Sequence, residues 1–305
     1  MTRSRTKASR IILACGLIAV SLGAAACSSP LIVRKDTAER LATPSFMHKR
    51  EIPAGPFRLT AYERVRKQGQ AANIYIEGDG QAFFSYGVPA IDPTPINPVA
   101  LHISTRDLAP NVIYLARPCQ YSGMIDKDIA CNKHYWSDAR YGKTTVGAMN
   151  SALDDIKKRY AITGFNLVGY AGGGAMAALV AAERKDILSL RTIAAPLDTT
   201  IPTLGHKVPN LSLSMNPVTV AAQIADIPQN HFLGEWDRFV GVTPFDSFRC
   251  ASGETTCIRS TIIGKADNEA GWVNKWPALL DLPVDCEKKP PVRPVRVCPV
   301  PVGVQ

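Results

Sequence analysis

The sequence predicts an α/β fold: a single domain built on a mostly parallel sheet with helices on both faces. Three observations lead to this fold class. Short apolar runs alternate with helical segments along most of the chain, which is typical of a parallel sheet covered on both sides. The runs are short and mostly apolar, as expected of strands in a sheet buried on both sides. Residues 166–185 also read as a strand, a glycine-rich turn and a helix.

Residues 1–26 are predicted to be a lipoprotein signal peptide. A basic start precedes an apolar run over 11–26, which is short for a membrane span and fits a secretory signal. The run ends in small residues before Cys27 and resembles the lipobox of bacterial lipoproteins, although Ala24 stands where leucine is commoner. That resemblance implies a lipidated Cys27 and a site in the bacterial cell envelope, at the outer membrane, facing the periplasm or the surface. The alternative is an ordinary signal peptide with a chance cysteine.

The formal net charge is +9, and four of the basic residues lie in the signal peptide, which leaves about +5 for the mature chain. Without a long basic run, this charge does not indicate a nucleic-acid partner. Apart from Cys15 and Cys27, six cysteines fall into three local pairs, and an exported chain favours disulfides. Proximity favours the pairs Cys119–Cys131, Cys250–Cys257 and Cys286–Cys298. Because no cysteine or histidine group has zinc spacing, neither a metal nor another cofactor is expected.

The elements of the mature chain follow in order. Residues 27–54 are polar, lack clear periodicity and are predicted to be a tether, and residues 55–285 form the domain. Strands are expected at 72–76, 112–116, 166–170, 188–194, 231–234 and 258–263. Helices are expected after Asn97-Pro98 to about residue 106, over 146–160 where apolar residues are spaced by three and four, over 172–185, and over 272–280. Residues 286–305 form a proline-rich basic tail, expected to be extended.

The stretch Gly169-Tyr170-Ala171-Gly172-Gly173 has the small residues that a nucleophile elbow requires around its strained tip. The pattern Gly-x-Ser-x-Gly is broken at one residue, because Ala171 stands where the serine would be. The turn aims backbone N–H groups at the space above Ala171, and the following helix start adds positive potential there. A dinucleotide site is a weaker interpretation, because the glycine spacing does not fit and the strand is not the first of the domain.

This stretch resembles the α/β-hydrolase superfamily, and the resemblance covers roughly residues 70–280. Residues 77–80 look like the loop that supplies the second oxyanion donor, and residues 92–101 and 116–121 are similar to segments of a bacterial exported α/β-hydrolase-like group. Residues 232–237 resemble the strand and turn that carry the triad acid, and residues 266–280 resemble the segment that carries the histidine. No single motif is specific, but their order is that of the superfamily.

The resemblance implies a set of site positions, two of which are degenerate. The nucleophile position is Ala171, the acid is Asp237, and the histidine position falls at Asp267 or Asn268; Gly172, Asp79 and Gly80 are the oxyanion region, and Tyr170 lines the pocket. Since no histidine follows His231, and His231 itself reads as a core residue, two of the three triad members are missing.

The sequence therefore predicts an envelope lipoprotein that is a pseudoenzyme with a binding or structural role. Its lipid anchor makes the membrane a partner, and a small acyl or carboxylate ligand could use the old oxyanion donors. One alternative is an active esterase, lipase or peptidase with a non-standard catalytic set, for which Ser122 and Ser137 are the serines considered, although neither sits on an elbow. The other alternative is an envelope assembly scaffold in which the fold supports the proline-rich tail.

Overall fold

The computed structural model describes residues 30–85, 87–122, 131–201 and 211–286. One sheet runs in the order β1-β2-β6-β3-β7-β8-β9-β10. The pairs β1–β2 and β2–β6 are antiparallel, and every pair from β6 to β10 is parallel. This sheet confirms the predicted fold class. Its strands are β1 (His48–Ala54), β2 (Phe57–Val65), β3 (Ala72–Ile76), β6 (Asn111–Leu115), β7 (Phe165–Tyr170), β8 (Ile187–Ile193), β9 (Gln229–Gly234) and β10 (Ile258–Ile263).

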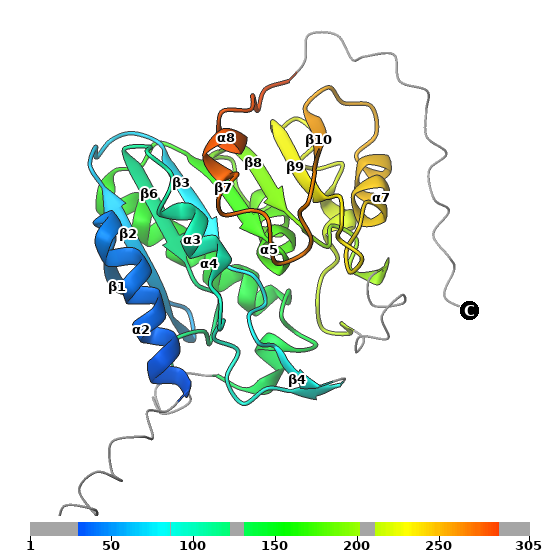
Figure 1. The fold of residues 1–305 in the computed structure, drawn as a ribbon. Helices are drawn as coiled ribbons and strands as arrows, with labels where there is room; N and C mark the ends of the chain where they lie inside the picture. The colour runs from blue at the N-terminus through cyan, green and yellow to red at the C-terminus, as the bar shows by residue number, and fades with distance from the viewer. Residues whose placement is uncertain (1–29, 86, 123–130, 202–210, 287–305) are drawn as a thin grey trace, which may run out of the picture.

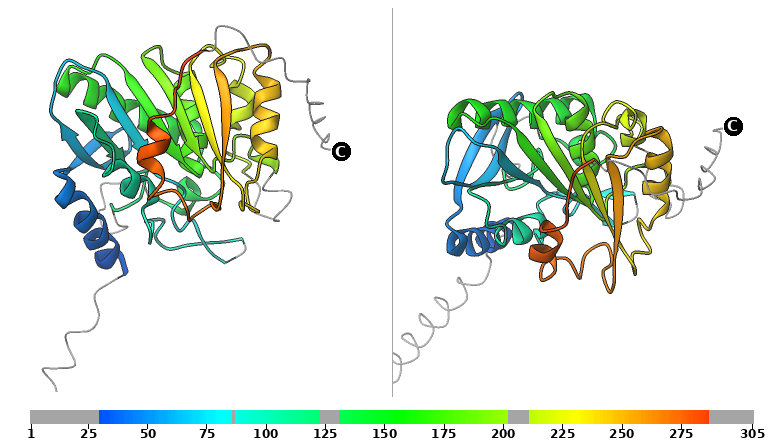
Figure 2. Two further views of the ribbon diagram at one scale, coloured as in Figure 1. Left: turned by 45° about the horizontal axis from the view of Figure 1, so that its top comes forward. Right: turned by 90° about the horizontal axis from the view of Figure 1, so that it is seen from above.

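Helices cover both faces of this sheet, so that the molecule has three layers (Figures 1 and 2). On one face, α4 (Lys143–Tyr160), α5 (Gly172–Ala182) and α7 (Thr243–Ala251) bury their apolar sides in one core cluster. On the other face, α2 (Pro30–Ala42), α3 (Val99–Ser104) and α8 (Trp276–Leu280) form a second cluster. Smaller elements are the hairpin β4 (Phe83–Ser85) and β5 (Val88–Pro89) and the 3₁₀ turns η2 (Thr43–Ser45), η3 (Lys133–Trp136) and η4 (Pro217–Val220). Among the described residues, no helix has the length and apolarity needed to cross a membrane.

The segment expected to be a tether is folded over most of its length. Residues 30–42 form α2, whose Ala38 and Ala42 are fully buried, and residues 48–54 form β1, which pairs with β2 along its whole length. The sequence pattern does not reveal these elements, because β1 is an edge strand with a polar outer side and α2 buries only small residues, so neither shows a clear apolar periodicity. The predicted boundary between tether and domain at residue 54 is therefore wrong. The predicted signal peptide, Cys27, Cys298 and the tail after residue 286 lie outside the described residues.

Most predicted strands match the observed strands within one or two residues. The helix predicted at 272–280 is shorter and begins at Trp276. Inside the domain, the strand β2, the helix α7, the two strands of the β4–β5 hairpin and the turns η3 and η4 were not predicted. Strand β2 is missed because it buries the polar side chains Thr60, Glu63 and Arg64. Glu63 pairs with Arg50 of β1 and Arg64 donates to the Asp107 carbonyl oxygen, so partners distant in sequence make their burial tolerable.

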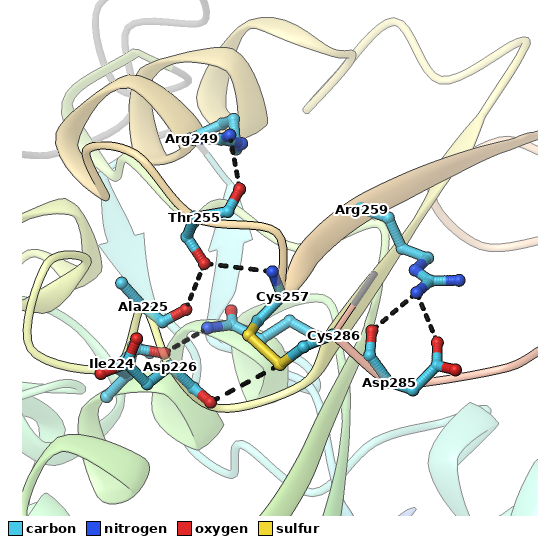
Figure 3. Close-up of a disulfide and its surroundings, with 10 residues drawn as sticks. Ile224, Ala225, Asp226, Arg249, Thr255, Cys257, Arg259, Asp285 and Cys286 are labelled. Atoms are coloured by element: carbon cyan, nitrogen blue, oxygen red, sulfur yellow. Dashed lines mark hydrogen bonds and ion pairs between the residues drawn. A yellow bond between two sulfur atoms is a disulfide. The ribbon is translucent and has the colours of Figure 1, made fainter. Parts of the chain in front are cut away.

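The disulfides correct two of the three predicted pairs. Cys119 bonds to Cys131 as predicted, but Cys257 bonds to Cys286 across 29 residues of sequence (Figure 3). The pairs Cys250–Cys257 and Cys286–Cys298 are therefore wrong, and Cys250 is itself disulfide-bonded. Local spacing misled because the chain returns after α8 to the start of β10, where Arg259 pairs with Asp285 at 2.6 Å.

Candidate functional site

Ala171 stands at the tip of a sharp turn between β7 and α5. Its φ of 47° and ψ of −123° are unusual for a residue with a side chain, and α5 starts at the next residue. The turn is held by the Ala171 amide, which donates to the Ile193 carbonyl oxygen at 2.8 Å, and by the Gly174 amide, which donates to the Ala171 carbonyl oxygen at 2.9 Å. The local geometry is the strand–turn–helix that the sequence predicts for an elbow.

Glycines let α5 approach the strands closely. A Cβ on Gly169 would overlap the Gly173 carbonyl oxygen, and a Cβ on Gly173 would overlap the carbonyl oxygens of Ile76 and Glu77. The helix that follows is buried through its first ten residues. The glycine pattern therefore has a packing reason independent of any chemistry at Ala171.

The carboxylate of Asp79 lies directly against the start of α5. A Cβ built on Gly172 would overlap the Asp79 carboxylate oxygens, so this carboxylate fills the space next to the first residue of the helix. Asp79 follows the carboxyl end of β3, and its side chain is 26% exposed. In an acyl-transfer enzyme, the backbone N–H of the residue after the nucleophile donates to the substrate oxyanion. Here a carboxylate of the protein itself packs against the residue at that position, Gly172.

Three side chains hold Asp79 in this position. Arg117 forms an ion pair with it, Arg140 Nε lies 3.6 Å from Oδ2, and the Tyr141 hydroxyl donates to Oδ1 and Oδ2 at 3.1 and 3.0 Å. The Arg117 guanidinium also lies over the Tyr141 ring, 4.9 Å from its centroid. We call Asp79, Arg117, Arg140 and Tyr141 the Asp79 cluster. The exposed fractions of Arg117 and Arg140 are only 5% and 11%, so both cations depend on the carboxylate for compensation.

The electrostatics of the cluster favour the ionised carboxylate. Burial opposes ionisation of Asp79, but the charges of Arg140 and Arg117 outweigh burial and hold the pKa of Asp79 below its ordinary value. Although burial also disfavours the Arg140 cation, Asp79 raises the pKa of Arg140. Burial, together with the Asp79 charge, raises the pKa of Tyr141 to about 12. The partial positive charge at the start of α5 acts in the same direction on the carboxylate.

Glu77 lies two residues before Asp79 and is buried under the same loop. Its Oε1 accepts hydrogen bonds from the backbone N–H groups of Gly78 at 2.9 Å and Ala100 at 3.4 Å. Burial raises the pKa of Glu77 to about 7, so this carboxyl group is partly neutral near neutral pH. Gly80, the last residue of the predicted oxyanion loop, has a positive φ of 61° and packs against the Pro93 carbonyl oxygen.

The other predicted triad positions lie in loops at the carboxyl ends of β9 and β10, but each side chain is used within its own loop. Asp237 Oδ1 accepts from the backbone N–H groups of Phe239 and Val240, both at 2.9 Å. Asp267 Oδ1 accepts from the N–H groups of Ala270 and Glu269 at 2.6 and 2.8 Å, and these bonds lower the pKa of Asp267. Both aspartates act as turn-forming residues.

Tyr170 links the elbow to the loop in which a histidine was expected. Its hydroxyl donates to the Asn268 carbonyl oxygen at 2.6 Å, and burial raises the pKa of Tyr170. The ring contacts Gly78, so that a Cβ there would lie 3.2 Å from a ring carbon. Tyr170 therefore braces the elbow between the loops after β3 and β10, which agrees with a packing role.

The remaining candidate bases and nucleophiles lie elsewhere. His231 is fully buried on β9, with Thr192 Oγ1 at 2.8 Å and Gln229 Oε1 at 3.1 Å. Burial lowers the pKa of His231 to about 3, which identifies it as a core residue, as its sequence context predicts. The Ser137 hydroxyl donates to the Lys133 carbonyl oxygen at 2.7 Å, and the Ser122 hydroxyl lies 4.0 Å from the disulfide sulfur of Cys131.

The space beside the Asp79 cluster is small. A cavity bordered by Asp79, Arg117, Arg140 and Trp136 has a volume of about 10 Å³, which is close to room for one water molecule. An acyl or carboxylate ligand of several atoms does not fit there unless side chains move. The residues that border this cavity include neither Ala171 nor Gly172, so it lies on the Arg117 side of Asp79.

Sequence reasoning missed Arg117, Arg140 and Tyr141. A clue existed for Arg117, because it follows β6 as Asp79 follows β3, and these strands are parallel neighbours. Charged residues just after adjacent parallel strands meet at the same edge of the sheet. Arg140 and Tyr141 come from the segment before α4, and no local pattern in the sequence marks them.

Comparisons with known proteins place this geometry in a known fold. No protein-family model matches the sequence, and no curated protein matches it. Three solved structures are similar at 13% sequence identity. A bacterial membrane phospholipase A described as a virulence factor matches over 85% of this chain and 91% of its own, with a TM-score of 0.52. An α/β serine hydrolase homologue from Coxiella burnetii (76% of this chain, 93% of its own) and an esterase from Pyrococcus furiosus (74% of this chain, 84% of its own) each have a TM-score of 0.50. At this identity the likeness establishes the α/β-hydrolase fold and carries no activity across to this chain.

Proposed function

We propose that this protein is a non-hydrolytic lipoprotein of the bacterial cell envelope, in which the catalytic centre of an α/β-hydrolase fold has become a structural centre. One observation carries the proposal: the Asp79 carboxylate occupies the space beside Gly172, next to the elbow tip at Ala171. An oxyanion bound near Gly172 would form beside this negative charge, and Ala171 offers no nucleophile to generate it.

Two further features support a structural role over a ligand-binding role. Arg117 and Tyr141 already hold the Asp79 carboxylate, so a carboxylate ligand that used these partners would have to displace Asp79. Asp237 and Asp267 are also bound to amides of their own turns. Binding of a small carboxylate after such a displacement is the second form of the same non-hydrolytic role.

Activity-based labelling tests the absence of hydrolysis. A fluorophosphonate probe should leave the wild-type protein unlabelled, and Ala171→Ser should also remain unlabelled because an unactivated serine is a weak nucleophile. Combining Ala171→Ser with Asn268→His, or with Asp267→His, supplies a base but leaves Asp79 beside Gly172. Adding Asp79→Ala to that pair should therefore be needed before slow labelling develops. Labelling of the wild-type protein at any serine would refute the proposal in favour of an active hydrolase.

Fractionation tests the envelope lipoprotein assignment. The proposed acyl chains on Cys27 hold the mature protein at a bilayer surface, so the wild-type protein should sediment with membranes and incorporate labelled fatty acid. Cys27→Ser should abolish the incorporation, with Cys15→Ser as the matched control that keeps it. Incorporation that persists in Cys27→Ser would show that the lipobox assignment is wrong.

A further inference from the structure

Several bulky apolar side chains are exposed at one end of the molecule. Phe84 and Ile91, in and just after the β4–β5 hairpin, are 79% and 76% exposed, and Ile96 is 64% exposed. Ile32 and Val33, in the first turn of α2, are each 51% exposed. We call these five residues the end patch. Single exposed apolar side chains are ordinary, but a group from two neighbouring segments marks an interaction surface.

Arg34 joins the two segments of the end patch. Its guanidinium donates to the Thr94 carbonyl oxygen at 2.8 Å, to the Asp92 carbonyl oxygen at 3.3 Å and to Gln81 Oε1 at 2.5 Å. These contacts fasten the first turn of α2 to the segment between residues 81 and 94. The start of α2 and the hairpin accordingly lie at the same lower end of the molecule in Figure 1. Arg34 therefore fixes the start of α2 to the segment around Ile91, so that both halves of the end patch lie at one end of the molecule.

The position of this surface along the chain identifies its occupant. Only two residues separate Cys27 from Pro30, the first residue of α2. Even a fully extended chain over this interval spans only about 10 Å. If Cys27 carries acyl chains, the first turn of α2 has to lie at the level of the lipid headgroups. Apolar side chains at that level can insert into the boundary between headgroups and acyl chains, as those of interfacial helices do.

We propose that the end patch docks the protein against the lipid bilayer and fixes its orientation there. The inference rests on the lipid anchor of the proposed function and adds a second attachment, made by the folded domain. Docking places the hairpin and the start of α2 in the membrane interface. The opposite end of α2 then faces away, because 13 helical residues span about 20 Å.

Tryptophan quenching by brominated lipids tests this orientation in the full chain. Phe84→Trp places a reporter in the end patch. The matched control is Leu108→Trp, because Leu108 is 87% exposed and lies near the far end of α2. The Arg64 guanidinium shows this position, since it donates both to the Ser45 carbonyl oxygen, just beyond the end of α2, and to the carbonyl oxygen of Asp107, the residue before Leu108. Each lipidated variant is purified from the envelope and reconstituted into phosphatidylethanolamine–phosphatidylglycerol vesicles with brominated or ordinary acyl chains.

The expected result is a loss of the added emission of Phe84→Trp in brominated vesicles, with the emission of Leu108→Trp unchanged. The wild-type tryptophans are common to both variants and set the background. Equal emission changes in the two variants, in protein that floats with the vesicles, would overturn docking while leaving the anchor intact. Protein that does not float would overturn the anchor and docking together. If the Phe84→Trp reporter is shielded to the same extent in brominated and ordinary vesicles, and the protein cross-links as a dimer, the end patch would be assigned to contact with a second copy of this chain.

Discussion

Removing the Asp79 carboxylate is the sharpest perturbation of the Asp79 cluster. Asp79→Ala leaves Arg117 and Arg140, which are 5% and 11% exposed, without their shared anion. Removing one partner of a buried ion pair costs about 3–5 kcal/mol. Because Asp79 is 26% exposed, solvent screens part of this, and we expect a loss of about 3 kcal/mol. In a domain of this size, that loss corresponds to a fall in Tm of about 6–12 °C.

The assay is equilibrium unfolding in urea, followed by circular dichroism, with Glu254→Ala as a control that removes an exposed acid. Acetate should partly rescue Asp79→Ala, because it can supply the missing carboxylate to the Asp79 cluster. At ten times its dissociation constant, acetate restores about 1.4 kcal/mol. Asp79→Asn leaves the cations uncompensated but keeps the site filled, so it should be destabilised without being rescued.

Two results would contradict this reasoning. If Asp79→Ala and Glu254→Ala had the same urea midpoint, the Asp79 carboxylate would not compensate the buried Arg117 and Arg140 cations. Acetate that stabilises the wild-type protein as much as Asp79→Ala would show a general salt effect and no opened anion site. In either case the Asp79 cluster would lose its role as the structural centre of the protein.

Two other predictions follow from the fold and the site. Burial raises the pKa of Glu77 from 4.5 to about 7, so between these pH values the folded protein binds a proton at Glu77 and the unfolded chain does not. Lowering the pH across this range should therefore stabilise the wild-type protein relative to Glu77→Gln by about 3 kcal/mol. A difference in urea midpoint between the two proteins that stays constant with pH would contradict this prediction. Peptide mapping without reduction should find Cys257 linked to Cys286, and replacing both with serine should cost about 3–4 kcal/mol; a peptide linking Cys250 to Cys257 would be the opposing result.

The sequence by itself determined the fold class and the elbow, because both depend on local features. Short apolar runs specify buried strands, and small residues around Ala171 specify a turn that admits a positive φ. Such features operate over a few residues, so periodicity and steric size reveal them. For the same reason β3, β7 and β10 were located within a residue.

Elements that depend on distant partners were not readable in this way. The polar sequence of β1 becomes a strand because it pairs with β2 and because Arg50 finds Glu63 and Asp155. Strand β2 carries buried charges whose partners come from other elements. The lack of local periodicity indicated a tether at β1, since the hydrogen bonds that stabilise an edge strand leave no mark on its own hydrophobic pattern.

Only the tertiary structure decided what the site contains. Asp79 was predicted to belong to the oxyanion region, but its carboxylate packs against Gly172 and is bound by Arg117 and Tyr141, which are 38 and 62 residues away. The Cys257–Cys286 bond likewise joins the start of β10 to the segment after α8. Both outcomes depend on which strand ends and loops become neighbours when the sheet assembles. That choice is made by the packing of the whole domain, whereas the sequence around each residue specifies only its local conformation.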